Sequence, residues 1–158
     1  MNMYDKRIRL RELMAAPECV PMMGAYDVLS AKLIEQAGFP IVYTGSFITG
    51  ASQYFLADVG LVQLKDLLPL AYEIAKEVDL PIVCDVDNGW FHSGNIWRTV
   101  HEFESAGVSG IQVEDGIIGK HVSTGAVDMS KDVMCDHIRA MCEARKDPNF
   151  VIIARTDA

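Results

Sequence analysis

Short apolar runs recur along the chain, and each is separated from the next by a segment whose apolar residues have helical spacing. Runs of this length are typical of buried strands. The five expected strands are residues 20–25, 39–43, 80–84, 110–114 and 150–154. Because strands that alternate with helices pair in parallel and are covered by those helices, the pattern predicts an α/β fold built on a parallel sheet.

The intervening segments predict five helices. Their expected ranges are 5–16, 27–34, 64–78, 95–106 and 130–145. The first is expected to be amphipathic, with Ile8, Leu10, Leu13 and Met14 on its apolar side. Each later helix follows a strand, as the α/β pattern requires.

Chain length limits how much of such a fold is present. A complete eight-fold β/α barrel needs about 250 residues, and this chain has 158, of which 50% are hydrophobic. Neither a linker nor a low-complexity segment divides it. We therefore expect a single domain over residues 1–158, with its own core but with fewer strands than a closed barrel.

Charge and cysteine usage exclude several classes of protein. The net charge is −8 with no basic stripe, which argues against a nucleic-acid surface. The charged N-terminus does not resemble a signal peptide, and no apolar run approaches the roughly 18 residues of a membrane span. Four cysteines without C-x-x-C spacing indicate free thiols in a reducing compartment. We expect a cytoplasmic protein that binds neither nucleic acid nor membrane.

Carboxylates follow the third and fourth expected strands. Asp85 and Asp87 lie two residues apart and should point the same way, and Glu114 ends the neighbouring strand. Carboxyl ends of parallel strands meet at one edge of the sheet, so these groups can converge there. Clustered carboxylates favour a cation, and all-oxygen ligation suits Mg²⁺, with Mn²⁺ as a substitute. The alternative is that they are solvated loop acids that cap helices.

Two further strand ends carry candidate binding groups. Tyr43-Thr-Gly-Ser46 ends the second strand, where backbone N–H groups and a hydroxyl can meet an anionic ligand. The alternative is an ordinary strand-to-helix turn. Arg155 ends the fifth strand and can pair with a substrate carboxylate, or else form an ion pair with Asp157 or Glu114.

With these residues in view, the chain resembles the isocitrate lyase / phosphoenolpyruvate mutase superfamily, nearest its methylisocitrate lyase and oxaloacetate decarboxylase members. The resemblance rests on five blocks in family order. They are Tyr43-Thr-Gly-Ser-Phe, Asp58-Val-Gly-Leu, Pro81-Ile-Val-Cys-Asp-Val-Asp-Asn-Gly, Ala106-Gly-Val-Ser-Gly-Ile-Gln-Val-Glu-Asp and Asp147-Pro-Asn-Phe-Val-Ile-Ile-Ala-Arg-Thr-Asp-Ala. It implies that this chain is the N-terminal part, about five strands, of a (β/α)8 TIM-type barrel, with a helix at about 5–16 before it.

The resemblance also implies residue roles. Asp85 matches a direct Mg²⁺ ligand, and Asp87 and Glu114 match ligands that act through water. The remaining matches are to groups that hold a small carboxylate substrate: Tyr43, Gly45, Ser46, Asp58 and Arg155. The family's shared species is the enolate of a 2-oxo acid, and full-length members are homo-oligomers, commonly tetramers.

One departure concerns the segment after the fourth strand. Lyases of the family carry Lys-Arg-Cys-Gly-His there, with the Cys as general acid, whereas this chain has Val122 at the Cys position. Lys120, His121 or water is the expected proton donor in its place, and Tyr43 is a further catalytic candidate. Cys84 does not replace the missing thiol, because strand alternation turns it toward the helix layer.

The resemblance therefore implies a Mg²⁺-dependent carbon–carbon lyase or decarboxylase. Its substrate would be a small 2-hydroxy or 2-oxo di- or tricarboxylate of the methylisocitrate, dimethylmalate or oxaloacetate type, and the reaction would pass through an enolate. Two alternatives stay open. One is a phosphonate enzyme resembling phosphonopyruvate hydrolase or mutase, and the other is a truncated, non-catalytic binding remnant.

Overall fold

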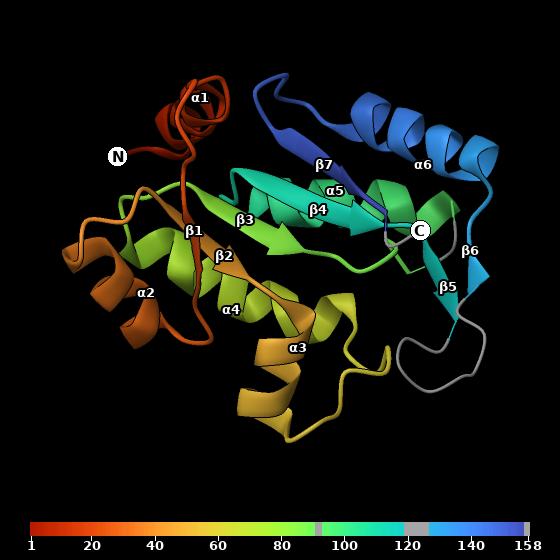
Figure 1. Ribbon diagram of the computed structural model, residues 1–158, viewed down its shortest axis with the longest axis horizontal. Helices are drawn as coiled ribbons and strands as arrows, with labels where there is room; N and C mark the ends of the chain where they lie inside the picture. Colours follow the sequence, from red (N-terminus) through yellow and green to blue (C-terminus); the bar gives the residue numbers. More distant parts are fainter. Residues whose placement is uncertain (91–92, 119–126, 157–158) are drawn as a thin grey trace.

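Five parallel strands form the central sheet, in the order β1-β2-β3-β4-β7 (Figure 1). The computed structural model describes residues 1–90, 93–118 and 127–156. The strands are β1 (Met22–Gly24), β2 (Ile41–Thr44), β3 (Ile82–Asp85), β4 (Gly110–Glu114) and β7 (Val151–Arg155). Their order in the sheet follows their order in the chain, as in a β/α barrel. The predicted α/β fold with a parallel sheet is confirmed, and each predicted strand overlaps an observed one.

Four helices cover one face of this sheet. They are α2 (Val28–Gln36), α4 (Leu64–Glu77), α5 (Ser93–Ser105) and α6 (Lys131–Ala144). Their apolar sides meet the outward-facing strand residues in the main core, where Ile74, Val100, Phe103 and Met141 are fully buried. No helix in the described ranges combines the length and apolar character that crossing a membrane requires.

Capping residues explain why the helix boundaries were predictable. The Asp27 carboxylate accepts a hydrogen bond from the Ser30 N–H at the start of α2, and the Ser130 hydroxyl accepts one from the Val133 N–H at the start of α6. Beyond the end of α2, Gly38 adopts a φ of 81°, a left-handed conformation that glycine takes without strain. Each of these signals involves residues only a few positions apart in the chain, so it can be recognised from the sequence alone.

The first helix departs from its prediction. It spans Met3–Met14, but the expected apolar side is wrong, because Ile8 and Met14 are exposed and Leu10 is buried beside Lys6 and Arg7. The helix lies across the segments that precede β3, β4 and β7, where main-chain carbonyls need hydrogen-bond donors. Its two buried cations meet that need, so the buried side of α1 is only partly apolar.

Arg7 makes most of this connection. Its side chain is 2% exposed and donates to the Val108 carbonyl, the Glu104 carbonyl and the Asp147 carboxylate. The Glu104 carboxylate in turn accepts hydrogen bonds from the N–H groups of Lys146 and Asp147. One guanidinium thus joins α1 to the loops before β4 and β7, and closes the amino end of the sheet.

Lys6 makes similar hydrogen bonds at the C-terminal end of α4. Its ammonium donates to the carbonyls of Ala75 and Val78, at 2.7 and 2.5 Å. Burial lowers the pKa of Lys6, while the carboxylates of Asp79 and Glu35 oppose that shift. A cation at a helix C-terminus also interacts favourably with the helix dipole, so Lys6 helps to fix α1 on α4.

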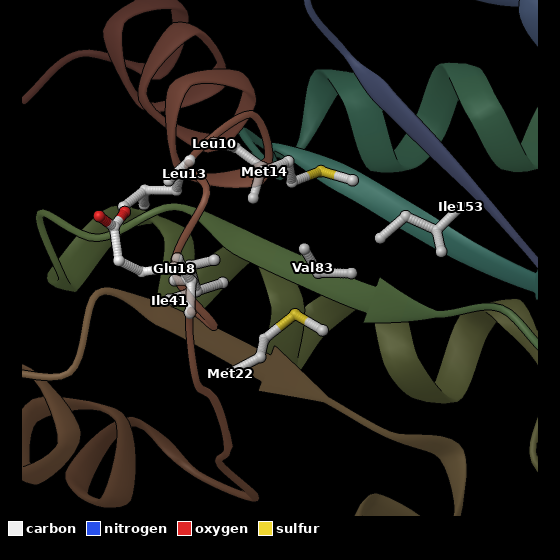
Figure 2. A pocket seen from close by; sticks show the side chains of 10 residues that line it. Leu10, Leu13, Met14, Glu18, Met22, Ile41, Val83 and Ile153 are labelled. Carbon is white, nitrogen blue, oxygen red and sulfur yellow. The ribbon is translucent and has the colours of Figure 1, made fainter.

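The inner face of the sheet borders an apolar cavity of about 250 Å³, which Figure 2 shows from close by. Leu10 and Leu13 of α1 lie on one side of it, and Met22, Ile41 and Val83 of successive strands line its floor. In a closed barrel this face is filled by layers of inward-pointing side chains from all the strands. The cavity therefore belongs to the barrel interior and lies apart from the polar residues described below.

Four short elements were not predicted. After β2 come α3 (Ser46–Thr49) and the π-helical turn η1 (Gly50–Tyr54), and after β4 come β5 (Gly116–Ile118) and β6 (Val127–Asp128). β5 and β6 pair in antiparallel fashion. Figure 1 shows α3 and this β5–β6 pair at the end of the sheet toward which β2, β3 and β4 point.

The contacts of Arg7 predict a large effect on stability. Replacing it, Arg7→Met, leaves two carboxylates and two carbonyls without their buried donor, and should lower the free energy of unfolding by about 3–5 kcal/mol. Urea denaturation followed by circular dichroism measures this. Arg9→Met is the matched control, because Arg9 lies on the same helix in an exposed pair with Glu12. Equal stability of the two variants would contradict the role of Arg7.

Candidate active site

Side-chain alternation places the polar residues of four strands on one face. The neighbours in register are Tyr43 with Val83, Asp85 with Gln112, and Glu114 with Arg155. Val83 faces the inner cavity, and side chains two residues apart share a face. Tyr43, Asp85, Gln112, Glu114 and Arg155 therefore lie at the carboxyl end of the inner face, where parallel sheets carry their functional groups.

Ser46 brings the two aspartates together. Its hydroxyl lies 3.3 Å from Asp85 Oδ2 and 2.8 Å from Asp87 Oδ1, and all three side chains are buried. The Asp87 N–H donates to Asp85 Oδ1 at 2.9 Å. The predicted convergence of Asp85 and Asp87 is thus observed. Its cause differs from strand alternation, because β3 ends at Asp85 and Asp87 reaches the cluster through a left-handed turn with a φ of 46°.

Glu114 adds a third buried carboxylate near this edge. Its N–H donates to the Asp87 carbonyl at 2.8 Å, which joins the end of β4 to the turn after β3. Glu114 Oε2 lies 3.5 Å from Nη1 of Arg155, and Arg155 is 38% exposed against 6% for Glu114. Of the two ion pairs considered for Arg155, the one with Glu114 is present. Asp157 lies outside the described residues.

Tyr43 has a neighbour that sequence reasoning missed. Gln112 Nε2 lies 3.2 Å from the Tyr43 hydroxyl, so the two side chains meet above β3. Burial raises the pKa of Tyr43 well above its ordinary value, and the nearby Asp85 carboxylate raises it further. The hydroxyl therefore keeps its proton at neutral pH. The signal for Gln112 was its position two residues before Glu114 on the same strand.

The turn after β2 contacts two parts of the site, and substrate binding by Gly45 and Ser46 stays a prediction. Gly45 begins α3, and a Cβ on it would lie 3.3 Å from Tyr43 Cε1, so a larger residue would displace the tyrosine ring. The Ser46 hydroxyl is directed at two carboxylates. The strand-to-helix turn considered as the alternative is therefore present, and it also carries a residue of the cluster.

The other candidates are placed as follows. Asp58 is half-buried in the segment between η1 and α4, and its contact with substrate stays a prediction. Lys120 and His121 lie outside the described residues. Cys84 is buried in the outer core, where Thr44 Oγ1 lies 3.0 Å from its sulfur. Burial raises the pKa of Cys84 to about 12, so it is a protonated core residue.

The donor chemistry of the cluster fits a hard divalent cation. The buried carboxylates of Asp85 and Asp87 both lie against the Ser46 hydroxyl, and a cation between such like charges lowers their repulsion, whereas Glu114 is paired with Arg155. Within the described ranges, no three Asp, Glu, His or Cys side chains are grouped closely enough to hold a metal ion. Mg²⁺ often keeps several waters and binds one or two carboxylates directly. The pair of Asp85 and Asp87 is compatible with that kind of binding.

A five-stranded parallel sheet with an acidic cluster at its carboxyl edge defines the class as barrel-type α/β proteins with a polar site at the strand ends. The family model for phosphoenolpyruvate phosphomutase matches residues 10–158. The chain therefore belongs to the phosphoenolpyruvate mutase family, as its resemblance implied.

Curated relatives of the chain include several lyases. It is 36% identical over 152 residues to 2,3-dimethylmalate lyase of Eubacterium barkeri, covering 95% of this chain and 53% of that protein. It is 39% identical over 155 residues to 2-methylisocitrate lyase of Shewanella oneidensis, covering 96% and 52%. Identity to oxaloacetate decarboxylase of Rhodopseudomonas palustris is 31% over 159 residues, covering 100% and 55%. The chain thus spans about half the length of the curated relatives it matches.

Solved structures agree with this half-length match. Oxaloacetate acetylhydrolase in complex with the inhibitor 3,3-difluorooxaloacetate superposes with a TM-score of 0.88 at 31% identity, covering 98% of this chain and 55% of that one. Phosphonopyruvate hydrolase in complex with oxalate and Mg²⁺ gives 0.83 at 30% identity, covering 100% and 53%. The fold is accordingly the N-terminal part of the barrel of this superfamily.

The environment of Tyr43 predicts its titration behaviour. Since burial and Asp85 hold its pKa above the ordinary value of about 10, the tyrosine should stay protonated while the protein remains folded. An ultraviolet titration of the wild type minus that of Tyr43→Phe should show no ionisation at about pH 10, with circular dichroism reporting the folded state. A complete transition in that difference curve near the ordinary value would contradict the burial argument.

Proposed function

We propose that the protein is a Mg²⁺-dependent carbon–carbon lyase or decarboxylase that acts on a small 2-hydroxy or 2-oxo di- or tricarboxylate. The observation that carries the proposal is the meeting of the Asp85 and Asp87 carboxylates at the Ser46 hydroxyl. The substrate class is supported by relatives named for dimethylmalate, methylisocitrate and oxaloacetate. A cytoplasmic homo-oligomer is part of the proposal: the cytoplasmic location rests on the sequence, and the oligomer rests on the resemblance.

Three residues would hold the cation. Asp85 would bind it directly, with Asp87 and Glu114 reaching it through water, and Mn²⁺ would serve as a substitute. With a 2-oxo diacid, bound Mg²⁺ would supply positive charge near the oxo oxygen, where negative charge develops as the carbon–carbon bond breaks. Ser46 would then keep the two aspartates at a fixed separation on either side of its hydroxyl.

Arg155, Tyr43 and Asp58 would contact the substrate. Arg155 presents a half-exposed guanidinium at the rim of the acidic cluster, and a guanidinium can bind a carboxylate through two parallel hydrogen bonds. Tyr43 presents a hydroxyl that stays protonated, so it can donate to the substrate's developing oxyanion. Gly45 permits this placement of the ring, and Asp58 completes the proposed substrate contacts.

Proton delivery distinguishes the two reaction types. Lyase cleavage of a 2-hydroxy diacid converts the hydroxyl into a carbonyl with loss of its proton and leaves a carbanion that gains a proton. Lys120, His121 or water is the proposed donor to the carbanion. Decarboxylation of a 2-oxo diacid releases CO₂ first and needs no proton donor for the bond-breaking step. The burial of Cys84 in the outer core, on the face of the sheet opposite the acidic cluster, supports a reaction in which this thiol is not the acid.

A direct assay tests this proposal. Each of oxaloacetate, 2-methylisocitrate and 2,3-dimethylmalate yields pyruvate, so pyruvate is followed with each substrate in the presence of Mg²⁺, after chelation, and after Mg²⁺ is restored. We expect metal-dependent pyruvate from at least one of them at a rate well above that of the same mixture without protein, because Mg²⁺ alone slowly decarboxylates oxaloacetate. Asp85→Asn should lower the rate by about a hundredfold or more.

The control is Asp136→Asn, which removes an exposed carboxylate of α6 that pairs with Arg139. It should keep the wild-type rate. Pyruvate from none of the three substrates would overturn the lyase or decarboxylase assignment. Full activity of Asp85→Asn would overturn the assignment of the metal ligand.

A phosphonate enzyme is the second candidate function, supported by the match to phosphonopyruvate hydrolase over the whole chain. Phosphonopyruvate is therefore included as a fourth substrate. Release of inorganic phosphate from it, with no pyruvate from the other three, would favour this alternative. Cation binding without turnover of any of the four would favour the non-catalytic remnant.

A further inference from the structure

The turn after β3 has an unusual backbone. Asp87, Gly89 and Trp90 all have positive φ angles, of 46°, 74° and 59°. Non-glycine residues adopt this left-handed conformation only where the surrounding structure holds them there. Since Asp87 belongs to the acidic cluster, whatever holds this turn also sets the direction of a candidate metal ligand.

Asn88 makes hydrogen bonds in two directions from the middle of that turn. Its Oδ1 accepts from the Trp90 N–H at 3.0 Å, within the turn itself. Its Nδ2 donates to the Gly116 carbonyl at 2.8 Å, at the start of β5. The amide therefore supports the left-handed backbone and also ties the turn to a different segment of the chain.

The hydrogen bond from Asn88 to Gly116 lies next to a main-chain hydrogen bond between the same two segments. The Glu114 N–H donates to the Asp87 carbonyl at 2.8 Å, so residues 87–88 are joined to residues 114–116 at two adjacent points. Glu114 Oε1 lies 3.5 Å from the position a Cβ on Gly116 would take. The Asn88 amide thus anchors the backbone beside the Glu114 carboxylate and stands next to Asp87.

We propose that Asn88 is a positioning residue that fixes the Asp87 and Glu114 carboxylates relative to each other, and thereby sets the affinity of the site for a divalent cation. This role rests on the proposed function, because it presupposes the cation. Asn88 itself need not touch the cation or the substrate. Residues that orient metal ligands commonly change metal affinity by tenfold to a hundredfold when they are replaced.

The test is Mn²⁺ binding to the protein without substrate, measured by electron paramagnetic resonance of the free ion. Asn88→Ala removes both hydrogen bonds of the amide. Asn88→Ser keeps a hydroxyl that can accept from the Trp90 N–H, but it is too short to reach Gly116. We expect each variant to bind Mn²⁺ about tenfold more weakly than the wild type, with the fold checked by thermal unfolding.

Asn95→Ala is the matched control. Asn95 Nδ2 donates a hydrogen bond to the Trp90 carbonyl at 2.9 Å. This variant therefore loses a side-chain hydrogen bond to the same turn but keeps the hydrogen bond from Asn88 to Gly116. Its Mn²⁺ affinity should stay within about twofold of the wild type. If this variant lost as much Mn²⁺ affinity as the Asn88 variants, any loosening of the turn would be enough to weaken Mn²⁺ binding. That result would overturn the specific role of Asn88.

The remaining outcomes separate this inference from the proposed function. If the wild type binds Mn²⁺ and both Asn88 variants bind it equally well, only the role of Asn88 is overturned. If the wild type binds no Mn²⁺, the metal site itself is wrong, and the role of Asn88 is overturned with it.

Discussion

Alternation of side chains along parallel strands separates two environments in this protein. Outward-facing residues such as Val42 and Cys84 pack against the helices in a continuous apolar core. Inward-facing residues of β2, β3 and β7 change from apolar at the amino end, as in Ile41 and Val83, to polar at the carboxyl end. The site depends on this change, because it gathers polar groups from separate strands at one edge of the sheet.

The two ends of the sheet bury side chains of opposite charge. At the amino end, Lys6 and Arg7 are buried cations that satisfy carbonyls and carboxylates of the loops they contact. At the carboxyl end, Asp85 and Asp87 are buried carboxylates brought together at one hydroxyl. Like charges at such short range are costly unless a cation joins them. The amino end is thus balanced by this chain's own residues, whereas the carboxyl end is suited to a bound ion.

Local signals account for what the sequence could predict. The apolar runs, the caps at Asp27 and Ser130 and the left-handed Gly38 are set by nearby residues, so the strands and the main helices were predicted close to their observed ends. The candidate ligands Asp85 and Glu114 followed from strand alternation in the same way. Their roles as ligands stay predictions, although their positions agree with them.

Contacts between distant segments account for what could not be predicted. The buried side of α1 depends on carbonyls about 70 and 100 residues away, so Arg7 could not be identified as a buried residue from its neighbours. Ser46 was expected to face a ligand, and its contacts with the aspartates come from a separate strand. The link from Asn88 to Gly116 is likewise set by two strand ends meeting, and nothing in the sequence near Asn88 indicates it.

The central claim is that the carboxyl edge of the sheet holds a divalent cation on Asp85. Anomalous X-ray scattering from a crystal of the protein grown with Mn²⁺ and oxalate tests it directly. The account predicts a single strong peak about 2.1 Å from an Asp85 carboxylate oxygen, with Asp87 and Glu114 within reach through ordered water. A fully occupied Mn²⁺ site elsewhere, with no peak beside Asp85, would contradict it.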